Sequence, residues 1–560
     1  MAVYGSEMTP ENIQQILDDS PAIELTITLK QANLNTAQLA CWLYELLEID
    51  PAMDAVRFDS RSTAALSAAA VKFLTGAAQL THTLLHSAGI PLYQPLAVAE
   101  PELLADDRIT VRVWVPTLAE LPAIKFNYAF EQALQLCKRA QQLKADSAHR
   151  SALNQYLETQ VLPKLGYGVL SGAATVPVLL AAQRAGIPFL HLGRSMYALG
   201  VGSAQRHLFN SVTDGDAVIG AKLAGDKATT ASLLKKAGLP TPHHVVVSSY
   251  ADALTAAQQI GWPVVVKPVD GERGEGVTVN VDGEPALKTA VELALKQSKL
   301  RSVIVEERIE GVCHRLYITN GALLYAVKRP AIDVTGNGVD SVATLARDAY
   351  NKERLRPSWK RQKRPTLDEA AIAHLRTLNL SPSYIPASGE SVALRLIEST
   401  ASGGGSIDVT PSVHPDNVTI ALQAAIAIGL ETVGVDIICE DISVPWHRGN
   451  ALITELNFQP VFGSGEVSLV LIPKFLEDYL TDRGRIPLAN FAADQSRAAA
   501  EQLAAWQASG RNAALLNIQS GELRWGDGRT VPPTLLRGRQ QLRALLLDRR
   551  LDALAIVGAV

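Results

Sequence analysis

The residue types best suited to phosphate chemistry occur in VVVKPVDGERGEGVTV, at positions 264–279. Gly271, Gly274 and Gly276 leave backbone N–H groups uncovered, so such a loop can wrap closely around a polyphosphate. Lys267 lies just before the loop and could place a positive charge on a phosphate oxygen. The pattern also suits a tight β-hairpin with an exposed lysine, because glycine patterns alone are weakly specific. It is not a P-loop, since no GK[ST] follows the last glycine.

Three side chains with oxygen atoms form a second candidate site further along the chain. Asp436 lies in the apolar run GVDII, and Glu455 and Asn457 lie in ITELNF. Residues two apart on a strand face the same side, so Glu455 and Asn457 are expected to share a face. Hard oxygen ligands of this kind suit a Mg²⁺ ion that bridges phosphates. The alternative is that these acids are solvated or salt-bridged at strand ends.

The surrounding sequence predicts the elements that would position these residues. Strands are predicted in WPVVVKPV, SVIVEERIEG, VGVDIICED and NALITELNF. The stretch 224–242 predicts a helix that ends at Gly238 and is followed by Pro240. Further helices are predicted within 284–300 and 414–430. Asn320-Gly321 predicts the tight turn of a hairpin, because both turn positions favour positive φ.

A chain of 560 residues is too long for one ordinary core, and its helical and strand-like runs alternate. We therefore predict a multidomain protein of the α+β and α/β classes. The expected segments are an N-terminal α/β domain of unknown role at 1–165, a central region at 166–474 and a small C-terminal α/β extension at 475–560. The apolar end LDALAIVGAV is expected to be tucked into a sheet.

Composition and charge exclude several classes of partner. The formal net charge of −4 argues against nucleic acid as the principal partner. No apolar run approaches the roughly 18 residues of a membrane span, and the first residues do not form a signal peptide pattern. The four cysteines lack CxxC spacing, so we expect free thiols in a cytoplasmic protein. A basic run, NKERLRPSWKRQKRP, is either a solvated face or a grip for an acidic or peptide substrate.

In their order and spacing, VVVKPVDGERGEGVTV, VIVEERIEG, GVDII and ITELNF resemble the ATP-grasp fold of carboxylate–amine ligases. The pattern is similar to the ATP-grasp domain of cyanophycin synthetases and to that of bifunctional glutathione synthetases. The resemblance covers roughly residues 166–463, and no GTNGKT-type loop follows it, so it does not include the second ligase module of cyanophycin synthetases. The sequence departs from the pattern at Ser399, at Ala401 and in QPVFG.

The resemblance implies a set of residues that bind ATP and Mg²⁺. It implies that Lys227 and Lys267 contact the ATP phosphates and that the loop 271–276 closes over them. The residues that it places around the nucleotide are Glu306, Glu307, Ile309, His314 and Arg315, and those that it assigns to Mg²⁺ are Asp436, Glu455 and Asn457. His314 could equally be an ordinary, partly buried histidine.

The resemblance also implies catalytic and substrate residues. Arg329 and Arg395 match arginines near the reacting phosphate, although both could be structural ion-pair partners. Ser402, Gly403 and Gly404, in TASGGGSIDVT, would receive the substrate carboxylate or the acyl phosphate, although a glycine run there could equally be a lid. Cys313 is expected to be a packing residue.

The expected activity is that of an ATP-dependent ligase. It would phosphorylate a carboxylate and let an amine attack the acyl phosphate, releasing ADP and phosphate, because phosphate is a better leaving group than hydroxide. The resemblance implies small amino acid or peptide substrates and a homo-oligomer. The alternatives are synthesis of a cyanophycin-like polymer or of a capped dipeptide, a non-catalytic nucleotide-binding subunit, and a binding protein for acidic polymers.

Overall fold

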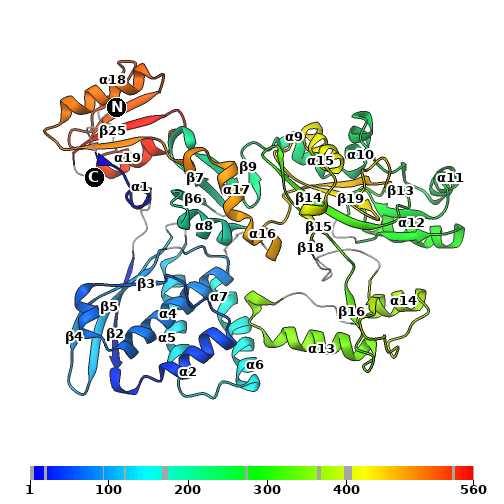
Figure 1. Cartoon of the computed structure of the whole chain (residues 1–560), viewed down its shortest axis with the longest axis horizontal. Coiled ribbons are helices and arrows are strands. Elements are labelled where there is room, and N and C mark those ends of the chain that lie inside the picture. Colours follow the sequence, from blue (N-terminus) through cyan, green and yellow to red (C-terminus); the bar gives the residue numbers. More distant parts are fainter. Residues whose placement is uncertain are drawn as a thin grey trace. The chain divides into compact units, whose positions relative to one another are not determined.

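A computed structural model describes residues 6–17, 22–92, 94–118, 121–166, 174–193, 195–271, 275–361, 367–395, 406–463, 465–531 and 536–558. The chain divides into two compact units (Figure 1). Unit 1 comprises Met1–Asn210, Arg356–Lys360 and Ile472–Val560, and unit 2 comprises Ser211–Leu355 and Arg361–Leu471. The domain boundaries expected from the sequence, at residues 165 and 474, stay a prediction.

The N-terminal part of unit 1 is a four-stranded sheet whose helices pack on one face. Strand β5 (Arg108–Val115) alternates buried and more exposed residues, so one face of the sheet lies in a core that contains Trp42, Phe73 and Phe126. Trp359, from the short segment Arg356–Lys360, also packs against this core. The sheet order is β2 (Ile23–Lys30), β5 (Arg108–Val115), β4 (Leu96–Leu103) and β3 (Val56–Phe58). The helices are η1 (Gln31–Asn33), α2 (Thr36–Ala40), η2 (Cys41–Leu46), α3 (Ser60–Ala65), α4 (Ala68–Ser87), α5 (Ala123–Ala140), α6 (Ser147–Tyr156), η3 (Leu157–Val161) and α7 (Leu162–Gly166).

The C-terminal part of unit 1 is a sheet covered by helices on both faces. Strand β25 (Ala553–Val557) is buried and pairs in parallel with β21 (Leu488–Phe491) and β22 (Ala513–Asn517), which confirms that the apolar run LDALAIVGAV is tucked into a sheet. Leu554 and Ile556 face α1 and α19, whereas Ala553 and Ala555 face α18. The strand order is β1 (Ser6–Glu7), β21 (Leu488–Phe491), β25 (Ala553–Val557), β22 (Ala513–Asn517), β23 (Leu523–Trp525) and β24 (Thr530–Val531), with helices α1 (Pro10–Leu17), α18 (Ser496–Ala508) and α19 (Gly538–Leu546).

A smaller antiparallel layer completes unit 1. Strand β7 pairs with β6 and β8, and α8 contacts α17. The backbones at Gly200 and Gly484 approach each other closely here: a Cβ on Gly200 would lie 2.5 Å from the carbonyl oxygen of Gly484. The elements are α8 (Thr175–Arg184), β6 (Phe189–Gly193), β7 (Met196–Leu199), η4 (Gly202–Ala204), β8 (Arg206–Phe209), α17 (Ile472–Tyr479) and η8 (Thr481–Gly484).

The first sheet of unit 2 carries the glycine-rich loop between two of its strands. Val264, Val266, Val303 and Val305 point into a core with α11 and α12, so the alternate residues of β11 and β13 lie on the other face. The sheet order is β10 (His244–Val247), β13 (Val303–Glu307), β11 (Val264–Pro268) and β12 (Thr278–Val281), with helices α11 (Tyr250–Ile260) and α12 (Glu284–Gln297).

The second sheet of unit 2 has five strands and is covered on one face by three helices (Figure 1). The predicted turn is present, with φ of 48° at Asn320 and 72° at Gly321. Leu316, Val435 and Ile437 point into the helical core. The strand order is β18 (Ile407–Asp408), β15 (Ala322–Lys328), β14 (Val312–Thr319), β19 (Thr432–Cys439) and β20 (Leu452–Phe458), with helices α9 (Val218–Ala224), α10 (Lys227–Lys236) and α15 (Pro415–Ile428).

An insertion between β15 and β18 forms a small layer with its own core. Val342, Leu375 and Leu394 are fully buried there. Its elements are β16 (Asp333–Thr335), α13 (Val342–Leu355), α14 (Glu369–Thr377) and β17 (Ser391–Ala393). Four short elements lie elsewhere among the described residues: η5 (Ser358–Lys360), β9 (Val212–Thr213), η7 (Thr410–Ser412) and α16 (Glu466–Val470).

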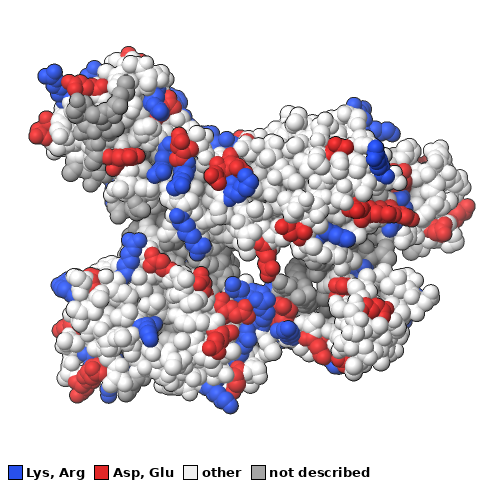
Figure 2. Space-filling view, in the orientation of Figure 1, with Lys and Arg blue, Asp and Glu red and all other residues white. Residues whose placement is uncertain are grey.

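Together these sheets confirm the predicted mixed α/β fold class. In the described part of the chain, no helix is long and apolar enough to cross a membrane. Figure 2 shows acidic and basic side chains interspersed on one face of the molecule. All four cysteines lie among the described residues, and none is in a disulfide bond.

Candidate functional site

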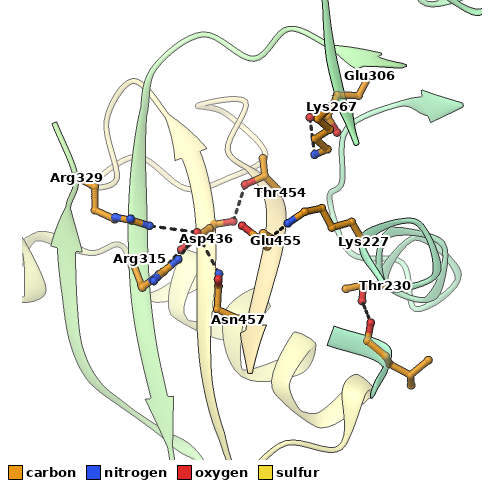
Figure 3. A network of polar contacts seen from close by, with 11 residues as sticks. Lys227, Thr230, Lys267, Glu306, Arg315, Arg329, Asp436, Thr454, Glu455 and Asn457 are labelled. Atoms are coloured by element: carbon orange, nitrogen blue, oxygen red, sulfur yellow. Dashed lines mark hydrogen bonds and ion pairs between the residues drawn. The ribbon is translucent and has the colours of Figure 1, made fainter. Parts of the chain in front are cut away.

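The centre of the candidate site is the carboxylate of Asp436, on the sheet face opposite the helical core. Arg315 lies directly across from Asp436 on the neighbouring strand, and its Nε and Nη2 atoms donate to Oδ1 and Oδ2, both at 2.7 Å (Figure 3). Arg329, just after β15, places Nη1 3.5 Å from Oδ2. The Nδ2 atom of Asn457 donates to the same oxygen at 3.2 Å. The carboxylate therefore lies among two arginines and one amide.

This arrangement keeps a buried carboxylate charged. Asp436 is only 4% exposed, and burial by itself would raise its pKa. The charge and hydrogen bonds of Arg315, then Arg329 and Asn457, lower the pKa of Asp436 below its ordinary value. Burial would lower the pKa of Arg315, but Asp436 raises it above the ordinary value. Both groups are therefore ionised at neutral pH.

A β-bulge brings Glu455 to the same face as Asp436. Ile453 pairs with Ile437, but Glu455 and not Thr454 pairs with Asp436, so Thr454 is an extra residue in β20. Without the bulge, Glu455 would share a face with Ile453, which points into the helical core. The Thr454 hydroxyl donates to the carbonyl oxygen of Asp436 at 3.3 Å. Asp436 and Glu455 consequently lie side by side on the sheet face opposite the helical core.

Lys227 joins this group from the first turn of α10. Its Nζ donates to Oε1 of Glu455 (Figure 3), and the two side chains are 18% and 34% exposed. Asp226 caps the helix, because its side chain accepts a hydrogen bond from the backbone N–H of Thr229 at 3.0 Å. A small pocket lined by Lys227, Thr230 and Glu455, among others, lies between α10 and β20.

Lys267 and Glu306 form a second pair on the first sheet of unit 2. Lys267 Nζ lies 2.7 Å from Glu306 Oε1, and the side chains are 13% and 11% exposed. Val265 pairs with Glu306 and Lys267 pairs with Ile304, so both charged side chains lie on the face away from α11 and α12. The reading of Lys267 as an exposed hairpin lysine therefore does not hold, although β11 and β12 are indeed paired.

The glycine-rich loop is described only in part. Gly276 has a φ of 72°, a conformation that favours glycine. A Cβ on Gly271 would lie 2.4 Å from Cγ of Pro268, so the loop is packed too closely there for a side chain. Gly274 lies outside the described residues.

One residue that the resemblance places around the nucleotide, His314, does not point to the Asp436 face. His314 is 2% exposed and lies on the helical side, where Cys439 Sγ is 3.5 Å from its Nδ1. Burial, then the charge of Lys328, lowers the pKa of His314. Glu307 pairs with Val264, so its side chain lies on the side of β13 opposite Glu306, and Ile309 is 8% exposed.

The remaining expected residues belong to the insertion and to the stretch that follows it. Arg395 Nη2 donates to Oδ2 of Asp368 at 2.5 Å, and Asp368 is the N-cap of α14. The described contacts therefore place Arg395 in an ion pair of the insertion. Ser402, Gly403 and Gly404, as well as Ser399 and Ala401, lie outside the described residues.

Sequence reasoning missed three residues that shape the site. Asp226 caps the helix of Lys227, and Thr454 forms the bulge beside Glu455. Gly434 lies on the site face, where a Cβ would be 3.3 Å from Arg315 Cδ and 3.2 Å from Pro460 Cβ. Two sequence signals could have found Gly434 and Thr454: a glycine inside an apolar strand, and a break in the alternation of apolar and polar residues in ITELNF.

The donor set fits Mg²⁺. Asp436, Glu455 and Asn457 present two carboxylates and one amide oxygen on one face of two neighbouring strands. In the described contacts, Arg315 Nε is the donor to Asp436 Oδ1 and Lys227 is the donor to Glu455 Oε1, whereas Oδ2 of Asp436 meets three donors, so room for further ligation remains on Oδ1 and on Glu455. No described group of three or more His, Cys, Asp or Glu side chains is arranged to hold a metal, so such a site needs the amide and oxygens from a ligand.

The sequence of this chain is similar to those of several known proteins. Residues 226–316 match the family described as carbamoyl-phosphate synthase L chain, ATP binding domain. Cyanophycin synthetase of Synechocystis sp. is 31% identical over 340 residues, which cover 60% of this chain and 38% of that protein. The glutathione biosynthesis bifunctional protein GshAB of Mannheimia succiniciproducens is 29% identical over 259 residues, covering 45% of this chain and 34% of that protein.

Among solved structures, a bifunctional glutathione synthetase from Pasteurella multocida matches with a TM-score of 0.41 and 23% identity, covering 62% of this chain and 52% of that chain. The chain spans less than half of the length of the curated relatives it matches. The match at 226–316 includes Lys227, Lys267 and Glu306. This chain is thus similar to part of cyanophycin synthetases and of glutathione biosynthesis bifunctional proteins, and residues 226–316 match an ATP binding domain.

Proposed function

We propose that this chain is an ATP-dependent carboxylate–amine ligase that joins an amino acid or peptide carboxylate to an amine and releases ADP and phosphate. The similarity to cyanophycin synthetases and glutathione biosynthesis proteins supports this reaction class. The observation that carries the proposal is the charged cluster of unit 2, in which Lys227, Arg315 and Arg329 meet Asp436 and Glu455 on one sheet face. Lys267 and Glu306 lie on the sheet that carries the glycine-rich loop.

The chain's own residues have distinct roles in this reaction. Lys227 and Lys267 bind phosphate oxygens, and the backbone of the loop 271–276 covers them. Arg315 and Arg329 stabilise the charge that develops on the transferred phosphoryl group. Asp436, Glu455 and Asn457 would hold Mg²⁺, which would neutralise phosphate charge. Arg395 is proposed as a further phosphate contact only from the resemblance.

The reaction proceeds in two balanced steps. A carboxylate oxygen of the substrate attacks the γ-phosphorus of ATP, and the bond to the β–γ bridging oxygen breaks to release ADP. The amine then attacks the acyl carbon, the C–O bond to phosphate breaks, and the nitrogen loses a proton. Phosphate leaves where hydroxide could not, which is why the first step makes amide formation feasible. Ser402, Gly403 and Gly404 are proposed to receive the acyl phosphate.

ADP release from the full chain tests the proposal. The assay uses MgATP with each amino acid and a set of dipeptides, alone and in pairs. We expect turnover with at least one pair and a fall of about 100-fold or more in Lys267→Ala, because a charge aimed at the phosphates is lost. Lys236→Ala is the control, because it removes the same charge from an exposed lysine in the last turn of α10. Equal turnover in Lys267→Ala and wild type would contradict the assignment.

Product length separates the remaining alternatives. Mass spectrometry of the reaction mixture distinguishes a single amide bond from a polymer that grows by repeated addition. MgADP binding without turnover for any substrate pair would instead indicate a nucleotide-binding subunit. A homo-oligomer is proposed from the resemblance, and light scattering of the full chain measures its mass.

A further inference from the structure

Three basic residues that the proposed function assigns to phosphate are each paired with an acid. Lys227 contacts Glu455, Lys267 contacts Glu306 at 2.7 Å, and Arg315 contacts Asp436 at 2.7 Å (Figure 3). None of these basic side chains is more than 18% exposed. The charges that would bind a triphosphate are thus already compensated within the protein. A nucleotide must exchange with an acid in order to bind them.

The Lys227–Glu455 pair differs from the others because both partners have a proposed ligand. Glu455 is a proposed Mg²⁺ ligand, and Lys227 is a proposed phosphate contact. While they are paired, the ammonium group repels a cation that approaches Glu455. The carboxylate likewise repels an anion that approaches Lys227. Lys227 therefore weakens cation binding at Glu455, and Glu455 weakens phosphate binding at Lys227.

Exchange is easier at this pair than at Arg315–Asp436. Arg315 makes two parallel hydrogen bonds to an aspartate that is 4% exposed, and Arg329 and Asn457 hold the same carboxylate. Lys227 presents a point charge on a flexible stem, and the Glu455 side chain is 34% exposed. A lysine can therefore turn from Glu455 to a phosphate oxygen without leaving a buried charge unpaired.

We propose that Lys227 and Glu455 form an exchange pair that makes nucleotide binding and divalent cation binding mutually dependent. This inference rests on the proposed function, because it assumes that the site takes a nucleotide together with Mg²⁺. A nucleotide phosphate draws Lys227 away and frees Glu455 for the cation, and the cation in turn frees Lys227 for the phosphate. Coupling between two ligands is reciprocal, so each ligand raises the affinity for the other by the same factor.

A purely structural salt bridge between α10 and β20 makes a different prediction. If Glu455 takes no part in cation binding, removal of Lys227 would lower stability but would leave the affinity of the site for a cation unchanged. In an exchange pair, loss of the positive charge exposes Glu455 and strengthens cation binding in the absence of nucleotide. An increase in metal affinity on removing a basic residue is therefore the distinguishing result.

The experiment measures binding rather than turnover. Mn²⁺ serves as the probe for the cation, and its free concentration is followed by electron paramagnetic resonance with the full chain and no nucleotide. We expect Lys227→Met to bind Mn²⁺ about three- to tenfold more tightly than wild type. The double variant Lys227→Met/Glu455→Gln should lose this gain, which shows that the gained site uses Glu455. Lys236→Met, with the same charge change on the same helix, should match wild type.

The reciprocal measurement uses ADP in the presence of EDTA. We expect Glu455→Gln to bind metal-free ADP more tightly than wild type by a similar factor, because Lys227 is released and a repelling carboxylate is removed. Unchanged or weaker Mn²⁺ binding by Lys227→Met, or weaker metal-free ADP binding by Glu455→Gln, would overturn the exchange pair. Failure of wild type to bind MgADP would instead overturn the proposed function, while the Mn²⁺ measurement without nucleotide remains decisive for the pair.

Discussion

Arg315 and Asp436 face each other on neighbouring strands and are joined by two hydrogen bonds of 2.7 Å. The pair is almost fully buried, with side-chain exposures of 18% and 6%. Its geometry explains how an aspartate with an ordinary preference for water stays charged inside a β-sheet. It also orients one carboxylate on the face where Glu455 and Asn457 lie.

Breaking this pair on one side should be costly. Arg315→Met leaves Asp436 buried with a weaker partner, Arg329 at 3.5 Å, and we expect the free energy of unfolding to fall by about 3 kcal/mol. Arg315→Met combined with Asp436→Leu should recover only part of this loss, because the buried carboxylate is gone but Arg329, 11% exposed, loses its ion-pair partner. Urea unfolding of the single variant, the double variant and wild type measures the difference. A single variant as stable as wild type would show that the pair does not hold the sheet.

Gly434 should be required for the position of Arg315. A Cβ there would lie 3.3 Å from Arg315 Cδ and 3.2 Å from Pro460 Cβ, closer than side chains usually pack. Gly434→Ala should cost about 1–3 kcal/mol of stability and weaken MgADP binding, measured by calorimetry. Gly225→Ala is the control, because its φ is −73° and the nearest atom to a Cβ is 3.5 Å away. Equal effects of the two substitutions would contradict this role.

Asp226 should hold Lys227 in position by capping the N-terminus of α10. Asp226→Ala removes the N-cap of α10, which should lower stability by about 1 kcal/mol and weaken MgADP binding. Asp226→Asn keeps an oxygen that can accept the hydrogen bond from Thr229 and should restore both properties. Unfolding in urea and calorimetric ADP titration provide the two readouts. If Asn and Ala behaved alike, the aspartate would act through its charge and not as a cap.

The buried His82 should make the N-terminal part of unit 1 sensitive to acid. Burial, then the neighbouring His86, lowers the pKa of His82 from 6.5 to about 3. The unfolded chain therefore takes up a proton near pH 6.5 that the folded chain takes up only near pH 3. Stability is fully present above pH 6.5 and should fall by about 1.4 kcal/mol for each pH unit below it.

His82→Leu removes this titration. Urea unfolding between pH 7.5 and pH 5 should show a shallower loss of stability in the variant than in wild type, by about 1.4 kcal/mol per pH unit below 6.5. His82 is 2% exposed, so the leucine that replaces it is also buried. Identical slopes would indicate that His82 is protonated in the folded protein.

Local sequence rules predicted most of the elements that carry the site. The predicted helices at 224–242, 284–300 and 414–430 are confirmed as α10, α12 and α15. The predicted strands are confirmed as β11, β13, β19 and β20, and Asn320-Gly321 is the turn between β14 and β15. These signals depend on residues near in sequence: apolar spacing, a glycine after a helix, and a turn that needs positive φ.

Some features of the site lay within reach of the same rules but were not used. His314 and Arg315 are consecutive on one strand, so only one of them can point to the Asp436 face. Arg315 does so, and His314 lies toward Cys439 on the other side. The two apolar residues Ile453 and Leu456 are three apart in β20, which signals a bulge in a strand that should alternate.

The order of apolar and polar residues by itself determined that this chain has a lysine on a buried strand before a glycine-rich loop, and that acids occur within two apolar strands. Only the tertiary structure decided which charges meet. Lys227 and Glu455 are 228 residues apart, and Arg315 and Asp436 are 121 apart. Strand order and register bring such distant residues together, and neither is encoded in any short stretch, because pairing depends on how whole sheets bury their apolar faces.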